Sequence, residues 1–468
     1  MIFFGCSGRE APSPSKDIVL ATVVPIGEVE PFSSRQGIGA MLVELLYRPL
    51  LRFSEDGQLK TDMAEKVWWE EQDNSFHVKL SPENAENVKF TLEHLQKLGI
   101  PEFKEGLKNL VSFDIKAPGE LVFRLKEYDR IFPFMLSRIP ILSKDPAQTT
   151  GDFVIESKKD DSIVLQRKVP SPTSVNRIVV RQIPSARRVL REFATGSVDI
   201  TFLTDEGDSK VLSDLPQFAF GELESAFLYL VLINRENSSI RRMPWSEISK
   251  NLHRDRMISE LGAKGLSPAY IPVRKVDRWG AGLMAPAGQP SEIEPFKVMS
   301  VPKAAIELSL LNTQAMDARI ALLLKRHLEE MGIPISLNYL EPQNFGEKIL
   351  KAKDFDLVLL PFAIRDALTS NYFVFHTAEG AGSVNLSGYS SPEVDKFLEA
   401  ARYQYDDERA KEDFSKAIAE MLKDPPGIFL FWLKTPLLYR KSCTGFKFNT
   451  NEFFSSLKDV RCEPSAAN

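Results

Sequence analysis

Cysteine is scarce in this chain of 468 residues, which has only three and no Cys-x-x-Cys arrangement. The histidines are scattered at His77, His94, His253, His327 and His376, so no ligand set has the spacing of a zinc site. Long apolar runs are also lacking, because Ala226–Ile233 is far shorter than the roughly 20 residues that cross a bilayer. Neither sign of charge dominates, since 59 basic and 64 acidic residues give a net charge of −5. The sequence therefore predicts a soluble body without a global basic surface for nucleic acid.

Motifs of the common enzyme classes are missing as well. The sequence has no Gly-x-Ser-x-Gly, no glycine-rich phosphate loop, no His-Glu-x-x-His and no cysteine–histidine pairing at a family spacing. Carboxylates are plentiful, but an adjacent pair such as Asp205 and Glu206 is more often a solvated loop than a catalytic dyad. The residues by themselves therefore indicate no catalytic centre, no cofactor and no metal site.

What the chain does have is enough apolar residues, 43% of the total, to form a large core in roughly three domain-sized units. The clearest pattern lies between 300 and 362. Strands are expected at Ile306–Leu311, Ile335–Leu340 and Phe355–Leu360, with helices at Ala315–Glu330 and Asn344–Ala352 between them. This β-α-β-α-β order predicts a parallel sheet with right-handed crossovers. Because ligands of open α/β sheets bind beyond the carboxyl ends of the strands, residues just after Leu360 are expected near a binding site.

The N-terminus resembles the end of a bacterial lipoprotein signal. Cys6 follows Phe3, Phe4 and the small Gly5, as in a lipobox whose cysteine thiol accepts the lipid. Fewer residues precede it than the ~7–15 apolar residues of a secretory signal, so the alternative is a free cysteine in a frayed terminus. The Pro- and Ser-rich stretch up to residue 17 predicts a flexible tether, which favours lipid attachment at Cys6.

The two remaining cysteines lie near the C-terminus. In an exported protein, Cys443 and Cys462 could form a disulfide that closes a loop of about 20 residues and stabilises the fold by about 3 kcal/mol. The alternative is two unrelated buried thiols, because separation in sequence does not measure their distance. We expect the bridge on condition that the protein is exported.

A series of short motifs carries a resemblance to a known family. The motifs are Glu30–Phe32, Leu45–Leu50, Asp56–Gly57, Met63–Trp68, Asn84–Val88, Thr149–Phe153, Gly196–Ile200, Arg254–Ile258 and Val384–Asp395. In this order the sequence resembles the family 5 extracellular solute-binding proteins, the peptide and nickel receptors of ABC importers. The resemblance covers the chain from about Ile18 to Phe446. Each motif alone is weak, and their common order makes the resemblance specific.

The resemblance implies an α/β, periplasmic-binding-protein-like fold, with two lobes around a ligand cleft and an additional inserted domain. The expected parts are a signal remnant and tether at 1–17, a discontinuous lobe I at 18–47, 148–232 and 439–468, the extra domain at 48–147, and lobe III at 233–438. The chain would cross between the lobes near Leu232–Asn234 and Pro436–Tyr439, where a hinge is expected. A ligand that contacts both lobes binds the closed state better and shifts the population toward it, without a chemical step.

The resemblance also indicates where the ligand binds. The expected lining residues are Ser34, Arg35, Phe362, Arg365, Asp366 and Asn385. In peptide-binding members an aspartate pairs with the α-ammonium group of the ligand, and Ala363 occupies that position here. Since a buried ammonium without a carboxylate is costly, either Asp366 replaces that aspartate or the ligand is not an ordinary peptide. Arg365 could instead bind a carboxylate or phosphate, or simply form a surface salt bridge.

The implied function is that of a lipid-anchored substrate-binding protein of an ABC importer, in the periplasm or at the cell surface. It would deliver a peptide or other small solute to a membrane permease and its ATPase, and it is expected to be a monomer without a cofactor, a metal or a nucleic-acid partner. Two other functions stay open. One is a binding protein without transport, such as a chaperone or chemoreceptor partner, and the other is a multi-domain hydrolase that uses carboxylates in the cleft.

Overall fold

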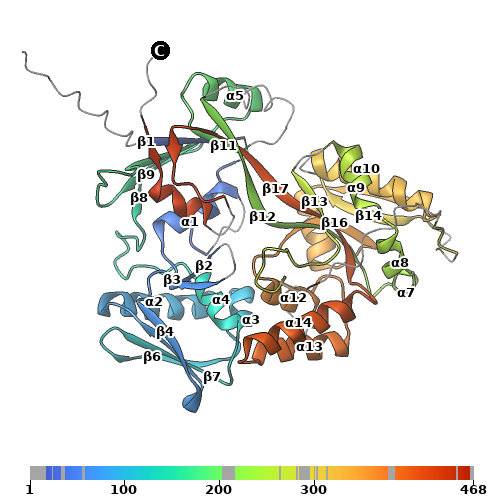
Figure 1. Ribbon diagram of the computed structural model, residues 1–468, viewed down its shortest axis with the longest axis horizontal. Coiled ribbons are helices and arrows are strands. Elements are labelled where there is room, and N and C mark those ends of the chain that lie inside the picture. Colours follow the sequence, from blue (N-terminus) through green and yellow to red (C-terminus); the bar gives the residue numbers. More distant parts are fainter. Residues whose placement is uncertain are drawn as a thin grey trace, which may run out of the picture. The chain divides into compact units, whose positions relative to one another are not determined.

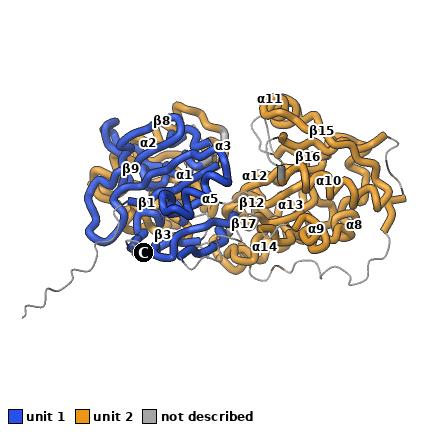
Figure 2. The backbone as a smooth tube through the Cα atoms, turned by 90° about the horizontal axis from the view of Figure 1, so that it is seen from above, with its two compact units in different colours: residues 1–48, 140–223, 435–468 blue, residues 49–139, 224–434 orange. Residues whose placement is uncertain are grey.

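The computed structural model in Figure 1 describes most of the chain. The described residues are 17–23, 25–32, 37–54, 58–202, 217–262, 265–280, 283, 296–299, 301, 304–312, 315–377, 385–448 and 452–463. The chain forms two compact units (Figure 2). Unit 1 comprises residues 1–48, 140–223 and 435–468, and unit 2 comprises residues 49–139 and 224–434. The backbone therefore passes between the units at Arg48–Pro49, Ile139–Pro140, Leu223–Glu224 and Lys434–Thr435.

Unit 1 is built on a sheet whose central strand is β1. It pairs in parallel with β10 on one side and with β11 on the other, and α5 connects β10 to β11. Alternate residues of β1 face opposite sides, so Ile18 and Leu20 enter one apolar core while Ala21 enters a second. The elements are β1 (Asp17–Thr22), α1 (Gly37–Leu46), β8 (Phe153–Lys159), β9 (Ser162–Arg167), β10 (Arg177–Gln182), α5 (Ala186–Ala194) and β11 (Ile200–Phe202).

The C-terminal segment of unit 1 carries the disulfide. Strands β18 (Cys443–Thr444) and β19 (Arg461–Cys462) pair in antiparallel fashion, with Cys443 directly opposite Cys462. The two cysteines are joined by a bond of 2.11 Å, and both lie in the larger apolar core of this unit. Helix α15 (Phe453–Ser456) and the 3-10 turn Leu457–Asp459 complete the segment.

The larger part of unit 2 contains the β-α-β-α-β order predicted from the sequence. Strand β14 pairs in parallel with β15 and with β16, and β12 pairs with β16 in antiparallel fashion. Strand β16 ends at Ala363 rather than at Leu360, because Phe227 of β12 pairs with that residue. The elements are β12 (Phe218–Ile233), β14 (Ile306–Leu311), α10 (Ala315–Glu330), β15 (Ile335–Leu340), α11 (Pro342–Phe345), the π-helix Gly346–Lys351 and β16 (Leu357–Ala363).

Strands β17 and β13 extend this sheet, and further helices pack around it. Several of the helices begin at capping residues that their sequences supply. Ser391 accepts a hydrogen bond from the Val394 backbone N–H at the start of α13, where Pro392 is the first helical residue. The elements are α7 (Ser238–Arg241), α8 (Trp245–Lys250), α9 (Arg254–Leu261), β13 (Leu266–Pro268), α12 (Ala367–Phe375), α13 (Pro392–Tyr403), α14 (Asp407–Met421) and β17 (Gly427–Arg440).

Residues 49–139, which include most of the span predicted as an extra domain, form a small antiparallel sheet in unit 2 with strand order β4-β5-β7-β6. Helix α2 begins at the Ser81 cap and ends at Gly99, whose φ of 61° suits glycine. The elements are β2 (Leu51–Phe53), β3 (Leu59–Thr61), β4 (Lys66–Glu70), β5 (Ser75–Lys79), α2 (Pro82–Leu98), α3 (Pro101–Gly106), β6 (Leu110–Ala117), β7 (Glu120–Leu125) and α4 (Ile131–Ser137). Among the described residues, no helix combines the length and apolar character that a bilayer span requires.

Candidate ligand-binding site

The carboxyl ends of β14 and β16 form the position in unit 2 where a ligand is expected. The strand order is β15-β14-β16, so the chain leaves β14 toward β15 and then crosses back to β16 on the other side. These two crossovers run in opposite directions, which creates a topological switch point between β14 and β16, where open α/β sheets bind ligands. Phe362, Arg365 and Asp366 lie at the end of β16 and directly after it.

Arg365 is the exposed charged residue at this strand end. Its carbonyl oxygen accepts a hydrogen bond of 3.4 Å from Nη2 of Arg274. Within the described part of the chain, no hydrogen bond or ion pair involves the Arg365 guanidinium group. The side chain is therefore available to a ligand, as a charged donor of several hydrogen bonds.

Asp366, by contrast, is buried and both of its oxygens accept hydrogen bonds from the protein. As the N-cap of α12, its Oδ2 accepts bonds from the backbone N–H of Thr369 (2.9 Å) and from Oγ1 of the same residue (2.7 Å). Its Oδ1 accepts bonds from Nε1 of Trp279 (3.0 Å) and Nη2 of Arg278 (3.4 Å). These contacts fix the start of the helix, and a ligand contact at Asp366 stays a prediction.

A second buried carboxylate, Asp277, supports the same helix start. Its Oδ2 accepts a bond of 3.2 Å from the backbone N–H of Ala367, and its Oδ1 accepts one of 3.0 Å from that of Trp279. Burial, together with the nearby charge of Asp366, raises the pKa of Asp277 to about 6, although Arg274 and Arg278 act in the opposite direction. No periodic pattern in the sequence singles out Asp277, Arg278 or Trp279, which come close to α12 only through the fold.

The remaining predicted residues are placed differently. Phe362 is half-buried on β16, opposite Leu228 of β12. Asn385 is buried in the loop before α13, where its Nδ2 donates to the carbonyl oxygens of Tyr389 (2.8 Å) and His376 (3.2 Å). Ser34, Arg35 and Cys6 lie outside the described residues. Three of the predicted lining residues thus share the end of β16, while the amide of Asn385 holds a loop together.

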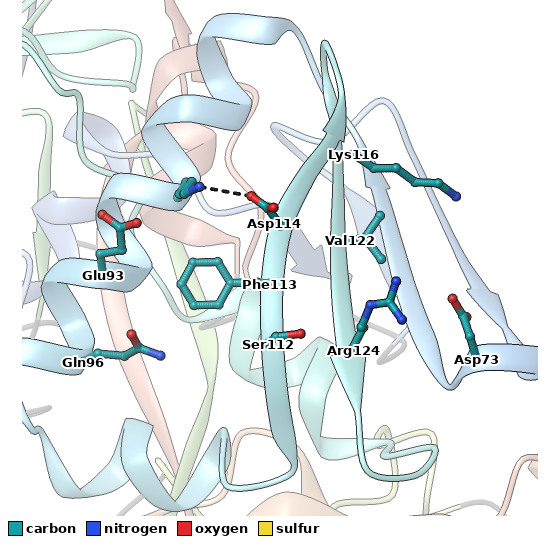
Figure 3. A pocket seen from close by; sticks show the side chains of 10 residues that line it. Asp73, Glu93, Gln96, Ser112, Phe113, Asp114, Lys116, Val122 and Arg124 are labelled. Carbon is teal, nitrogen blue, oxygen red and sulfur yellow. Dashed lines mark hydrogen bonds and ion pairs between the residues drawn. The ribbon is translucent and has the colours of Figure 1, made fainter.

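A separate surface hollow of about 640 Å³ lies on the small sheet of unit 2 (Figure 3). Its walls come from α2, β6 and β7, and Phe113 points toward α2. Lys89 and Asp114 form an ion pair of 3.0 Å within it, which satisfies two of its charges. The hollow is lined by Asp73, Lys89, Glu93, Gln96, Ser112, Phe113, Asp114, Lys116, Val122 and Arg124. This hollow does not lie at the carboxyl ends of parallel strands, and its lining carries charges of both signs. The candidate site is therefore the end of β16.

The side chains of this region do not form a metal site. Among the described residues, no group of three or more histidine, cysteine, aspartate or glutamate side chains is arranged to hold a metal ion. The switch point instead carries arginines and two carboxylates that accept hydrogen bonds from the protein. The arginines of this arrangement can bind an oxyanion by charge-assisted hydrogen bonds.

Comparisons with known proteins support the fold. No family model matches the sequence, and no curated protein matches it. The oligopeptide-binding protein AppA from Bacillus subtilis, solved with a nonapeptide, is 16% identical with a TM-score of 0.77, over 97% of this chain and 100% of that chain. The periplasmic binding protein DppA from Helicobacter pylori, solved with the peptide STSA, is 16% identical with a TM-score of 0.77, over 96% and 98%.

A third similar structure has a different kind of ligand. NikZ from Campylobacter jejuni, solved with Ni(L-His), is 16% identical with a TM-score of 0.74, over 96% of this chain and 100% of that chain. The chain therefore has the α/β fold of periplasmic binding proteins over nearly its whole length, which confirms the fold implied by the sequence resemblance. The ligand does not follow from the fold, because these structures hold peptides in two cases and a nickel complex in the third.

Proposed function

We propose that this protein is the substrate-binding component of an ABC importer. It captures a small solute or peptide in a cleft between two lobes and delivers it to a membrane permease that works with an ATPase. The observation that carries the proposal is the likeness in fold to peptide- and nickel-complex-binding proteins along 96–97% of this chain. We further propose that the protein is exported, acts as a monomer and is anchored by lipid at Cys6.

The connections between the units are consistent with hinge closure. Strands β12 and β17 each run through a passage from one unit to the other, at Leu223–Glu224 and Lys434–Thr435. Small changes of φ and ψ in such continuous strands allow two rigid bodies to rotate without breaking their internal packing. A ligand that contacts both lobes shifts the equilibrium toward the closed form, which the permease would recognise.

The proposal is tested with protein purified from its own host. Native mass spectrometry of the full chain should show a bound small molecule that is lost on denaturation. After ligand removal and refolding, adding the released solute at 100 times its Kd should stabilise the fold by about 2.7 kcal/mol and raise Tm by about 3 °C. Small-angle X-ray scattering should show a smaller radius of gyration with the solute present. An unchanged Tm and scattering curve, with no solute released, would exclude the proposed function.

A further inference from the structure

The charges around the end of β16 point to the chemical class of the ligand. Arg365 is exposed there, and Arg274 donates to its carbonyl oxygen. The same loop that supplies Arg274 also carries the exposed Lys275 and the half-buried Arg278. Four basic side chains thus accompany the two carboxylates of Asp277 and Asp366. The region is locally basic in a chain of net charge −5.

Neither carboxylate is available to a cationic group on a ligand. Asp366 accepts hydrogen bonds from Thr369, Trp279 and Arg278, and it is only 6% exposed. Asp277 is 7% exposed and accepts bonds from two backbone N–H groups. Turning Asp366 toward an ammonium group would give up the N-cap of α12 and would leave N–H donors without acceptors.

We propose that the ligand carries an anionic group, a carboxylate or a phosphate, and that Arg365 binds this group at the end of β16. The inference rests on the proposed function, because it assumes that the switch point of unit 2 contacts the transported solute. The planar guanidinium group offers paired N–H donors that match two oxygens of such an anion. The basic surroundings also attract an anion from solution and raise its rate of association.

The proposal predicts the outcome of binding measurements with matched probes. The probes are Ala-Ala-Ala and its C-terminal amide, succinate and succinamide, and glycerol 3-phosphate and glycerol, each titrated by calorimetry into the refolded, ligand-free full chain. The anionic member of at least one pair should bind about 10-fold or more tightly than its neutral partner, because it alone supplies a charged acceptor to Arg365. The probe pair that shows this difference in affinity also tells whether the protein recognises a carboxylate or a phosphate.

Variants then assign the effect to Arg365. R365Q should weaken binding of the anionic probe by about 10- to 100-fold, and R365K should recover part of the loss. R242Q removes the same charge from an exposed arginine elsewhere in unit 2, after α7, and should change the affinity less than about 2-fold. Equal affinity of R365Q and the wild type, or equal binding of the neutral partner, would overturn the proposal.

The molecule released from the native protein completes the test. A released solute with a carboxylate or phosphate supports the proposal, and a released solute without any anionic group overturns it while the proposed transport function stands. If no solute is released and no probe binds, the proposed function fails, and the anionic ligand fails with it.

Discussion

Breaking the ion pair between Asp129 and Arg402 is expected to destabilise unit 2 more than breaking any exposed salt bridge. Both side chains are fully buried, and Nε of Arg402 donates to Oδ1 of Asp129 at 2.9 Å, with a second bond from Nη2 to Oδ2. The pair joins residues 49–139 to α13, where the backbone N–H of Arg130 also donates to the carbonyl oxygen of Arg402 (3.0 Å). Removing one partner of such a pair leaves an uncompensated charge in the interior.

The magnitude follows from burial and size. R402M should lower the free energy of unfolding by about 3–5 kcal/mol, because the Asp129 carboxylate remains buried without its partner. The expected fall in Tm is about 3 °C if the whole chain unfolds as one cooperative unit and about 8 °C if unit 2 unfolds by itself. Replacing both partners, as in D129L/R402M, should recover much of this loss, since no charge then remains buried.

Differential scanning calorimetry on the full chain measures these changes. R409M, an exposed arginine on the neighbouring helix α14, is the matched control and should change the stability by less than about 0.5 kcal/mol. Limited proteolysis of R402M should also cleave residues 49–139 faster than in the wild type. A Tm of R402M equal to that of R409M would refute the reasoning. So would a double variant as unstable as the single one, because the loss would then come from packing rather than from charge.

Three further predictions concern other parts of the chain. The raised pKa of Asp277, about 6 in the folded state against an ordinary value of 3.8, means that the folded state binds the proton more tightly. Unfolding free energy should therefore fall by about 2 kcal/mol between pH 4 and 6, and chemical denaturation of D277N should show a smaller fall. Reduction of the Cys443–Cys462 disulfide should lower the free energy of unfolding by about 3 kcal/mol, and therefore lower Tm in dithiothreitol. The variant C443A/C462A should show the same lower Tm in the absence of dithiothreitol. C6A should abolish labelling by radioactive palmitate and release the protein from membranes in its host; retained label would exclude Cys6 as the anchor.

Much of the central fold of unit 2 follows from sequence periodicity. The segments Ile306–Leu311 and Ile335–Leu340, predicted as strands, form β14 and β15 with these bounds, because apolar residues alternate with polar ones over a length typical of a strand. The end of β16 was predicted three residues early. Its last residues, Pro361, Phe362 and Ala363, are exposed or half-buried, and they stay extended because β12 pairs with them up to Ala363. Because β12 lies far from β16 in the sequence, this pairing leaves no pattern in the residues of β16 itself.

The candidate site was less predictable for a chemical reason. Asp366 and Asn385 have the side chains that bind ligands, and the same side chains cap helices and fix loops. The sequence indicated both as lining residues, yet the structure shows Asp366 at the start of α12 and Asn385 bonded to the Tyr389 carbonyl oxygen. Trp279, which donates to Asp366, lies 87 residues away in the chain, so no spacing rule could connect the two.

The start of α12 explains why this strand end presents a cation. A helix begins with unpaired N–H groups and a partial positive charge, so it favours carboxylates beside its first turn. Here Asp366 and Asp277 supply them, which turns both acidic groups inward. The guanidinium group of Arg365, one residue earlier, has no such acceptor among the described residues and stays exposed. The same dipeptide therefore serves two purposes: Asp366 caps the helix, and Arg365 stays exposed, as the proposed binding of an anionic ligand requires.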